Sequence, residues 1–326
     1  MSNELWQWTA AELAAGIRSG RISSVEATES AIARMDAVNP AINAVVDTMP
    51  ETAISEAKTA DESLRKHGAA GPLHGVPMTV KINVDFKGRA TTNGVIANKD
   101  HKAEQDSSTI AAVRAGGLPI LGRTNTPAYS MRAFTSNDLH GATFNPHDKA
   151  ITCGGSSGGA GSAVAAGIGA IGHGNDIGGS VRHPAYCCGV YGLRPTSGLI
   201  PQTSPSMPER KIVSQLMAVQ GVLARSLEDI RLGMQMMSRP DPNDIWQVPA
   251  GDIFEPLAHR PCKVAVVAET DESPADPEVS AAIRQAAAML ADAGYEVEEV
   301  PTPSFRSWSI TGASFSATRC AAVSAF

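Results

Sequence analysis

The stretch Thr152–Ser197 reads TCGGSSGGAGSAVAAGIGAIGHGNDIGGSVRHPAYCCGVYGLRPTS. It contains two glycine clusters that carry serine, Gly154–Gly159 (GGSSGG) and Asp176–Ser180 (DIGGS), separated by an apolar segment rich in alanine and glycine. Glycine loses more backbone entropy on folding than any other residue, so two such clusters are costly as scaffold alone. The pattern therefore predicts backbone that approaches a ligand closely and directs its N–H groups at it.

The 326 residues are 43% hydrophobic and 18% charged, with a net charge of −6. This composition is typical of a globular protein and excludes a disordered chain. The negative net charge argues against a nucleic-acid-binding surface spread over the whole molecule, and no direct nucleic-acid binding is expected. The N-terminus lacks the basic start, apolar run and cleavage site of a signal peptide, which predicts a cytoplasmic protein.

The most membrane-like stretch, Ala163–Ile171, is about half as long as a membrane-spanning helix requires. It is therefore interpreted as a buried helix, and no membrane partner is expected. Five cysteines lack the CxxC spacing of a zinc site or redox motif, which favours buried, reduced thiols. They are Cys153, Cys187, Cys188, Cys262 and Cys320. Cys153 and Cys187 lie near the glycine clusters, so a role in lining a pocket stays open.

Hydrophobic periodicity and capping signals predict alternating helices and strands. Helices are expected at 9–18 (opened by a Thr9–Glu12 capping box), 24–37 (ended by Asn39-Pro40), 51–66, 107–115, 226–237 and 277–293. Extended segments are expected at 41–48, 74–81, 118–122, 263–269 and 296–300, and a long loop over a site at 123–148. The strand–helix–strand order of 263–300 is a βαβ unit, which favours a parallel strand pair and an α/β architecture.

Lys81 stands at the end of an apolar run. Such a lysine usually extends its ammonium group to solvent. The alternative is a desolvated lysine whose lowered pKa lets it act as a base. Lys81 alone does not decide between them.

Three interpretations of the glycine clusters compete. Nucleotide binding is disfavoured, because the clusters lack the Gly-Lys-Ser/Thr of a P-loop and the Gly-x-Gly-x-x-Gly context of a dinucleotide site. A packing segment with serines in turn positions stays open. The third is nucleophilic catalysis, in which Ser180 follows consecutive backbone N–H groups that can converge on an oxyanion. Lys81 would then supply the base, and the other serines could relay the proton.

A serine–histidine arrangement cannot be excluded by spacing. His74, His140, His173 and His183 all lie in glycine- or proline-rich surroundings. There is no Gly-x-Ser-x-Gly nucleophile elbow around Ser180, however, and no HExxH pair for a zinc hydrolase.

The two clusters in their order, GGSSGG and DIGGSVRHPAYCCGVYGLRPTSG, resemble the amidase signature family. The resemblance extends upstream to GPLHGVPMTVKINVD, LGRTNTPAYS and GATFNPHD, and to the N-terminal helices, so that it covers about residues 5–240. It implies an α/β fold with a large, mixed, twisted central sheet flanked by helices in three layers (α/β/α). One domain is expected over 1–326: a helical region (1–70), a catalytic core (71–240), a βαβ extension (241–305) and an atypical tail (306–326).

The resemblance also implies roles for single residues. Ser180 would be the nucleophile, Ser156 a bridging serine after a cis peptide bond at Gly155, and Lys81 the neutral base. The backbone N–H groups of Ile177, Gly178, Gly179 and Ser180 would form the oxyanion hole, Ser157, Asp176 and Arg182 would support the site, and Tyr129, Met131, Phe134 and Cys153 would line the substrate pocket. The implied reaction is amide hydrolysis through an acyl-enzyme, with a small-molecule amide as substrate and without metal or organic cofactor.

Three departures from the family pattern stand out. Ile82 occupies a position where the family commonly has an acidic residue, which puts the electrostatic setting of the lysine in doubt. Asn175 occupies a threonine or serine position, where a changed hydrogen bond is expected. Family members usually continue well beyond residue 326, which suggests a truncated or frame-shifted C-terminus and a sheet incomplete at that end. An exposed sheet edge would invite homo-oligomers. The A component of an amidotransferase, which releases ammonia from glutamine, and an inactive family member are the alternatives.

Overall fold

The computed structural model describes residues 4–206, 216–251, 253–255, 263–269 and 274–301. Contacts group the chain into two compact units, Met1–Phe254 and Glu255–Ala325. The first unit holds a six-stranded sheet with its covering helices, and the second holds a pair of strands and one helix.

The first unit mixes helices and strands along its sequence. The helices are α1 (Ala10–Arg18), α2 (Ser24–Ile42), α3 (Pro50–His67), α4 (Ser108–Ala115), α5 (Gly158–Ala165), α6 (Arg182–Cys188) and α8 (Leu227–Met237), with short 3-10 turns η1 (Leu5–Gln7), η2 (Ile96–Asn98) and η3 (Ala128–Ser130). The strands are β1 (Val45–Thr48), β2 (Met78–Lys81), β3 (Ile120–Thr124), β4 (Ser136–Asn137), β5 (Gly141–Ala142), β6 (Ile171–Asp176), β7 (Tyr191–Leu193) and β8 (Val219–Ala224).

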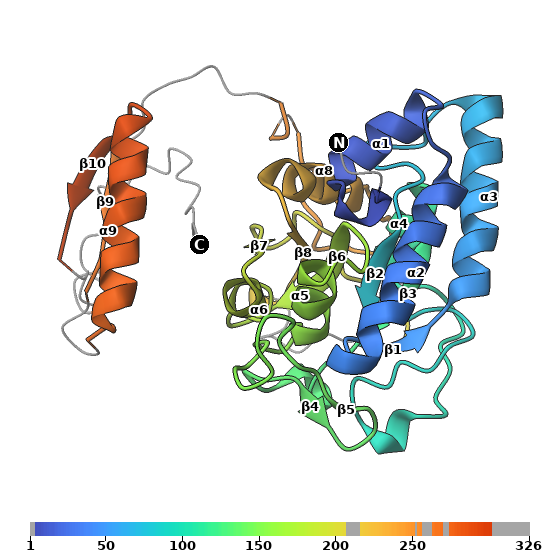
Figure 1. Cartoon of the computed structure of the whole chain (residues 1–326), viewed down its shortest axis with the longest axis horizontal. Helices are drawn as coiled ribbons and strands as arrows, with labels where there is room; N and C mark the ends of the chain where they lie inside the picture. The colour runs from blue at the N-terminus through green and yellow to red at the C-terminus, as the bar shows by residue number, and fades with distance from the viewer. Residues whose placement is uncertain (1–3, 207–215, 252, 256–262, 270–273, 302–326) are drawn as a thin grey trace. The chain divides into compact units, whose positions relative to one another are not determined.

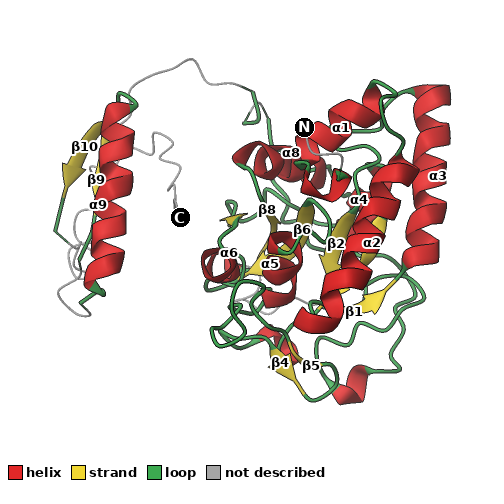
Figure 2. Ribbon diagram, in the orientation of Figure 1, coloured by secondary structure: helices red, strands yellow, loops and turns green. Residues whose placement is uncertain are grey.

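Six of these strands form one mixed sheet in the order β1-β3-β2-β6-β8-β7. β2 pairs in parallel with both β3 and β6, whereas β1, β8 and β7 join antiparallel. Helices flank the sheet in Figures 1 and 2, which confirms the predicted α/β fold with a mixed central sheet.

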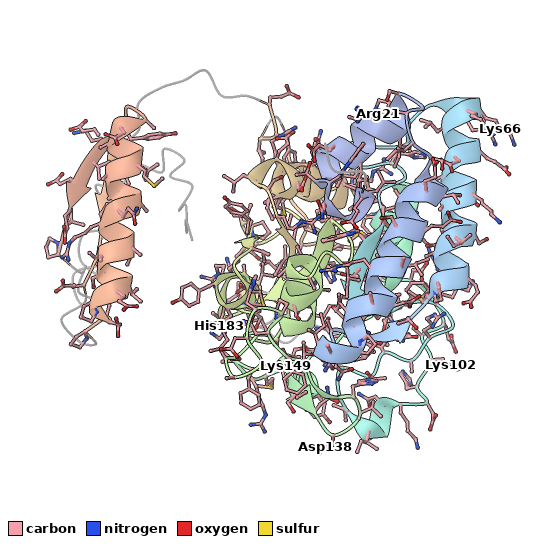
Figure 3. The ribbon with its side chains drawn as sticks, viewed as in Figure 1. Arg21, Lys66, Lys102, Asp138, Lys149 and His183 are labelled. Atoms are coloured by element: carbon pink, nitrogen blue, oxygen red, sulfur yellow. The ribbon has the colours of Figure 1, made fainter. Side chains whose placement is uncertain are left out.

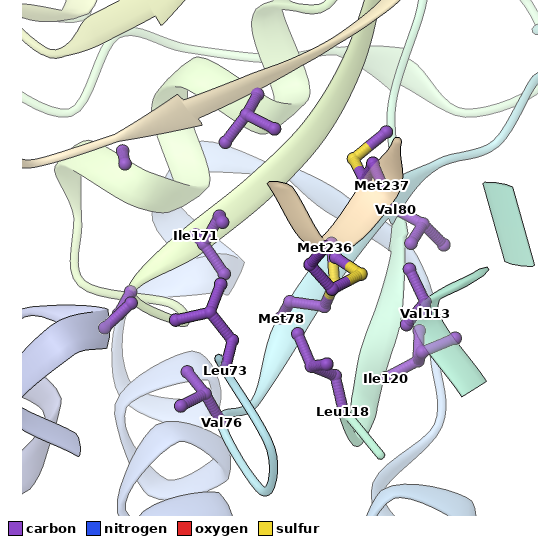
Figure 4. Close-up of a cluster of buried hydrophobic side chains, with 14 of the residues drawn as sticks. Leu73, Val76, Met78, Val80, Val113, Leu118, Ile120, Ile171, Met236 and Met237 are labelled. Carbon is purple, nitrogen blue, oxygen red and sulfur yellow. The ribbon is translucent and has the colours of Figure 1, made fainter. Parts of the chain in front are cut away.

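Strand alternation assigns side chains to the two faces of the sheet. Met78 and Val80 of β2 belong to a core cluster that includes residues of α1, α4 and α8, and Figure 4 shows their side chains beside Met236 of α8. The next residue, Lys81, therefore projects from the opposite face, which α5 covers. The sheet thus positions this lysine beside the first glycine cluster.

Capping signals in the sequence fix where the first two helices start. Thr9 accepts a hydrogen bond from the Glu12 N–H while the Glu12 carboxylate accepts one from the Thr9 N–H, so the predicted capping box is confirmed. Ser23 and Glu26 form the same reciprocal pair at the start of α2. Each box satisfies N–H groups that would otherwise lack a partner at the helix start.

The predicted end of the second helix at Asn39-Pro40 is wrong, because α2 continues through Pro40 to Ile42. A proline one turn before the end costs few backbone hydrogen bonds, and Ile42 gains a buried position in the core. The helix ends where Asn43 adopts a left-handed backbone conformation with φ of 50°. Asparagine tolerates this conformation better than most residues.

The buried helix predicted at Ala163–Ile171 is also wrong in extent. α5 ends at Ala165, and Ile171 is already the first residue of β6. Gly167 and Gly169 have positive φ angles of 83° and 74°, which turn the chain from helix into strand. The short apolar run was ambiguous because its two halves belong to different elements.

Other helix and strand boundaries differ from the predicted ones by a few residues. Of the extended segment expected at 41–48, only Val45–Thr48 is a strand, and β3 begins at Ile120 instead of residue 118. The predicted loop at 123–148 contains the end of β3, η3 and the small β4–β5 hairpin. No helix in the described part of the chain is long and apolar enough to cross a membrane.

The second unit contains β9 (Lys263–Val266), α9 (Pro277–Asp292) and β10 (Glu296–Glu299). β9 and β10 pair in parallel, from Lys263 opposite Glu296 to Val266 opposite Glu299, which confirms the predicted βαβ unit. The atypical tail at 306–326 lies outside the described residues.

Candidate active site

Lys81 occupies the last position of β2, and its side chain is fully buried. Its Nζ atom lies 2.8 Å from Ser156 Oγ, 3.0 Å from Ser157 Oγ and 2.7 Å from Asn175 Oδ1. Ser156 and Ser157 belong to the first glycine cluster, and Asn175 stands immediately before the second. The structure thus joins the upstream lysine to both segments, and the interpretation of Lys81 as a solvent-exposed charge is wrong.

Burial controls the protonation of Lys81. It lowers the pKa of the amine to about 7, against an opposing effect of the negative charge of Asp176. A lysine with this pKa is substantially neutral at physiological pH and can accept a proton.

Ser156 and Ser157 immediately precede α5, and both are buried. The peptide bond between Gly155 and Ser156 is cis, as the family resemblance predicts. Gly174 of β6 allows Ser157 to approach the strand, because a Cβ atom at this position would lie 2.8 Å from Ser157 Oγ. The absence of a side chain at Gly174 thus lets Ser157 lie against β6, within reach of the lysine.

Ser180 follows β6 in the second cluster and is partly exposed. Its carbonyl oxygen accepts a hydrogen bond of 3.2 Å from the Ser157 N–H, which places its backbone beside the serine pair. Its hydroxyl makes no hydrogen bond with the described residues, including Ser156. The hydroxyl is therefore free to turn toward a ligand or toward Ser156.

Three of the four backbone N–H groups expected in the oxyanion hole, those of Ile177, Gly178 and Ser180, have no hydrogen-bond partner among the described residues. The fourth differs from the expectation, because the Gly179 N–H donates to Asp176 Oδ1 at 2.8 Å. Gly179 therefore shapes the turn in this structure and leaves the other three groups open.

Asp176 holds the segment that carries Ser180. Its carboxylate accepts hydrogen bonds from the Gly179 N–H at 2.8 Å, from the Val181 N–H at 3.0 Å and from the Arg182 side chain at 3.0 and 3.1 Å. Burial by itself raises the pKa of Asp176, but the hydrogen bonds from Arg182 and from the backbone lower the pKa overall. The ionised carboxylate thus braces the turn that carries Ser180.

None of the four candidate histidines contacts a serine of the site. His74 bonds to the Ala60 carbonyl, His140 to Thr92, and His183, labelled on α6 in Figure 3, to Cys187. His173 accepts the Lys81 backbone N–H and pairs with Gln220, and burial lowers its pKa to about 4. The serine–histidine alternative is thus unsupported, and His173 is a neutral support for β2.

Asn83 and Asn175 are site residues that the sequence did not single out in this role. Asn175 contacts Lys81 directly and exchanges two hydrogen bonds with Asn83. Ile82 is buried and brings no charge to the lysine, so Asp176 is the acidic group that acts on its pKa. Of the two residues that depart from the family pattern, Asn175 contacts the amine directly.

Three of the four predicted pocket residues are exposed: Tyr129, Met131 and Phe134. Their segment passes beside the site, since a Cβ atom on Gly155 would lie 2.7 Å from the Phe134 nitrogen. The prediction for Cys153 is wrong, because this residue is buried in an apolar cluster with Ala160 and Val164, and burial raises its pKa to about 11.

The other cysteines follow the predicted pattern in part. Cys188 is buried and Cys187 is half-buried, and both are free thiols. Cys262 and Cys320 lie outside the described residues. No three His, Cys, Asp or Glu side chains in the described part of the chain gather in a way that could hold a metal ion.

The amino-acid sequence matches the Amidase family model over residues 26–322. It is 51% identical over 300 residues to an indoleacetamide hydrolase of Bradyrhizobium diazoefficiens, covering 92% of this chain and 57% of that protein. It is 35% identical over 301 residues to the A component of a glutamyl-tRNA(Gln) amidotransferase of Thioalkalivibrio sulfidiphilus, covering 90% of this chain and 60% of that protein.

The fold is shared with solved structures. A 6-aminohexanoate cyclic dimer hydrolase complexed with substrate superposes with a TM-score of 0.79 at 36% identity, over 91% of this chain and 61% of that one. The chain therefore spans 57% to 61% of the length of these relatives. The family model nevertheless covers most of the chain, which belongs to the amidase signature family.

Proposed function

We propose that this chain carries the catalytic site of an amidase that hydrolyses a carboxylic amide to an acid and ammonia or an amine. One observation carries the proposal: a fully buried lysine with a pKa of about 7 lies 2.8 Å from a serine hydroxyl. Such an amine is a base within hydrogen-bond reach of the proton that it would accept.

The chemistry follows from this contact. Lys81 accepts the Ser156 proton as Ser156 accepts the Ser180 proton, and Ser180 Oγ forms a bond to the amide carbonyl carbon. The negative charge on the carbonyl oxygen is met by the open N–H groups of Ile177, Gly178 and Ser180. The proton returns through Ser156 to the amide nitrogen, the C–N bond breaks, and an acyl-enzyme remains. Water then adds to the acyl carbon, releasing the acid and regenerating Ser180.

An aryl or other small apolar amide is the proposed substrate class. The indoleacetamide hydrolase is the relative with the higher identity of the two compared. The exposed segment beside Gly155 presents Tyr129, Met131 and Phe134, an aromatic and apolar surface that suits such a side chain. Indole-3-acetamide is therefore the first compound to test.

Covalent labelling and product release test the proposal together. A fluorophosphonate should add one adduct that maps to Ser180 and is absent from Ser180→Ala and Lys81→Met, and indole-3-acetamide should yield indole-3-acetic acid and ammonia in equal amounts. Folded protein that is not labelled and releases no ammonia would overturn the proposal and favour an inactive family member.

The amidotransferase role is the second candidate because of the 35% identity to an amidotransferase component. Glutamine replaces indole-3-acetamide in the same assay to test it. Ammonia release from glutamine, increased by a copurifying partner and absent with indole-3-acetamide, would favour this role over the proposed one.

A further inference from the structure

Two asparagines form a reciprocal amide pair beside Lys81. The Asn175 side chain donates from Nδ2 to Asn83 Oδ1 at 3.0 Å, and Asn83 donates from Nδ2 to Asn175 Oδ1 at 3.2 Å. Because an amide nitrogen only donates and its oxygen only accepts, each side chain fixes the orientation of the other. The pair thus holds Asn175 Oδ1 at its position 2.7 Å from Lys81 Nζ.

The partners of Lys81 Nζ have unequal capacities. Asn175 Oδ1 can only accept a hydrogen bond from the amine. Ser157 donates its hydroxyl proton to the backbone carbonyl oxygen of Asn175 at 3.3 Å. Because that proton is used, the Ser157 oxygen also accepts a hydrogen bond from the amine. Ser156 Oγ is the remaining neighbour at 2.8 Å.

A neutral amine has two N–H groups and one lone pair. With Asn175 and Ser157 both accepting, the two N–H groups are used and the lone pair faces Ser156 Oγ. We propose that Asn175, held in orientation by Asn83, is a positioning residue that directs the lone pair of Lys81 at the Ser156 proton. This rests on the proposed function, in which that proton is the one transferred.

The neutrality of the amide matters as well as its position. A carboxylate in place of Asn175 would also accept an N–H from Lys81, but its full charge would favour the ammonium form. The amide oxygen orients the amine without that charge. Ile82 supplies no acid either, so the asparagine pair orients the base while burial keeps it near neutrality.

Asn83 extends this arrangement to the proposed pocket. Its Nδ2 also donates to Ser130 Oγ at 3.0 Å, and Ser130 donates to Asn93 Oδ1 at 2.8 Å. Ser130 lies between the exposed side chains of Tyr129 and Met131. The Asn83 amide therefore links Asn175, which contacts the base, to the segment proposed to bind the substrate.

The experiment measures the rate of Ser180 labelling by a fluorophosphonate against pH, in the full chain. Asn175→Leu removes the oxygen that accepts from Lys81. The plateau rate should therefore fall about 10- to 100-fold, because the base is no longer held in orientation. Asn83→Ala frees Asn175 to rotate and should lower the plateau in the same direction. Together the two substitutions should cost less than the product of their separate effects, because both act on one contact.

Asn175→Asp distinguishes a positioning role from a merely structural one, because a structural role would leave the midpoint of the pH–rate curve unchanged. It keeps an acceptor of the same shape but adds a charge, so the midpoint of the pH–rate curve should move to higher pH. Asn243→Leu, at an exposed position, is the matched control and should match the wild-type curve. Folded Asn175→Leu and Asn83→Ala proteins with the wild-type plateau, or an Asn175→Asp curve with an unmoved midpoint, would overturn the inference. Failure of the wild-type chain to label would instead refute the proposed function.

Discussion

Lys81 Nζ lies 2.8 Å from Ser156 Oγ, and both residues are almost wholly excluded from solvent, with exposures of 0% and 1%. Among the described residues, no carboxylate lies within ion-pair distance of the amine. A buried ammonium group without a paired carboxylate is unfavourable, so the lysine is held near neutrality. The contact therefore joins the proposed base to its proposed proton donor at a point that is shielded from bulk solvent.

The rate of Ser180 labelling should rise with pH through about 7 and then level off. Below this pH the Lys81 amine, with its pKa of about 7, carries a proton and cannot accept another. At one unit below the midpoint the rate should be about tenfold under the plateau. Fluorophosphonate labelling reactions, quenched at fixed times at each pH from 5.5 to 9, give this curve. A flat curve across this range would show that Lys81 is not the titrating base.

Asp176→Asn should move the midpoint of that curve to lower pH. The negative charge of Asp176 opposes the effect of burial on the Lys81 pKa, so its removal favours the neutral amine. Asp138, labelled in Figure 3, is exposed, and Asp138→Asn serves as the control. It removes the same charge and should leave the midpoint in place. A midpoint that moves upward, or equally in both variants, would contradict the assigned interaction.

The α/β class and the βαβ unit could be predicted because their signals are local. Alternating apolar residues and a capping box act within one element, and β9, α9 and β10 follow one another directly in the chain. The extent of α2 could not be predicted, because Ile42 gains its burial from residues distant in the sequence. Local rules overestimated the effect of Pro40 because that proline stands only one turn from the helix end.

The contact between Lys81 and Ser156 could be predicted because both residues lie in motifs of fixed order, whereas the other surroundings of Lys81 could not. Asn175 meets Lys81 across 94 positions of sequence, and nothing near Asn175 signals a lysine partner. The proximity of Cys153 to the glycine cluster in sequence suggests a position in the pocket, but adjacent residues of an extended segment can face opposite ways. Its burial depends on α5 and α6, which the local pattern does not position.

Ser180→Ala should abolish labelling and lower amide hydrolysis by at least about 10³-fold, as expected when a catalytic nucleophile is removed. The Ser180 hydroxyl makes no hydrogen bond with the described residues, so the free energy of unfolding should change by less than about 0.5 kcal/mol. Activity and urea denaturation of the same preparation check both statements. Retained hydrolysis in a fully folded variant would require another nucleophile.

Lys81→Met should flatten the pH dependence of stability between about pH 7 and 10. The Lys81 pKa is about 7 in the folded chain, against roughly 10.4 in an unfolded one. Between these values the unfolded chain binds more protons, so wild-type stability from this group rises with pH and falls as the pH drops toward 7. The melting temperature of wild type relative to the variant should thus be higher at pH 9 than at pH 7. An equal difference at both pH values would contradict the buried, titrating lysine.

Gly159→Ala should destabilise the first unit by about 1–3 kcal/mol, the usual cost of overfilling a packed interior. A Cβ atom at Gly159 of α5 would lie 2.7 Å from the Asn125 carbonyl oxygen and 2.8 Å from that of Ala44. These are backbone atoms beside strands β3 and β1, so they cannot rotate away as a flexible side chain would. Gly178→Ala is the matched control, because no heavy atom lies within 4 Å of its Cβ position. Urea denaturation should therefore separate the two variants, and equal midpoints would mean that α5 can shift away from the sheet without loss of stability.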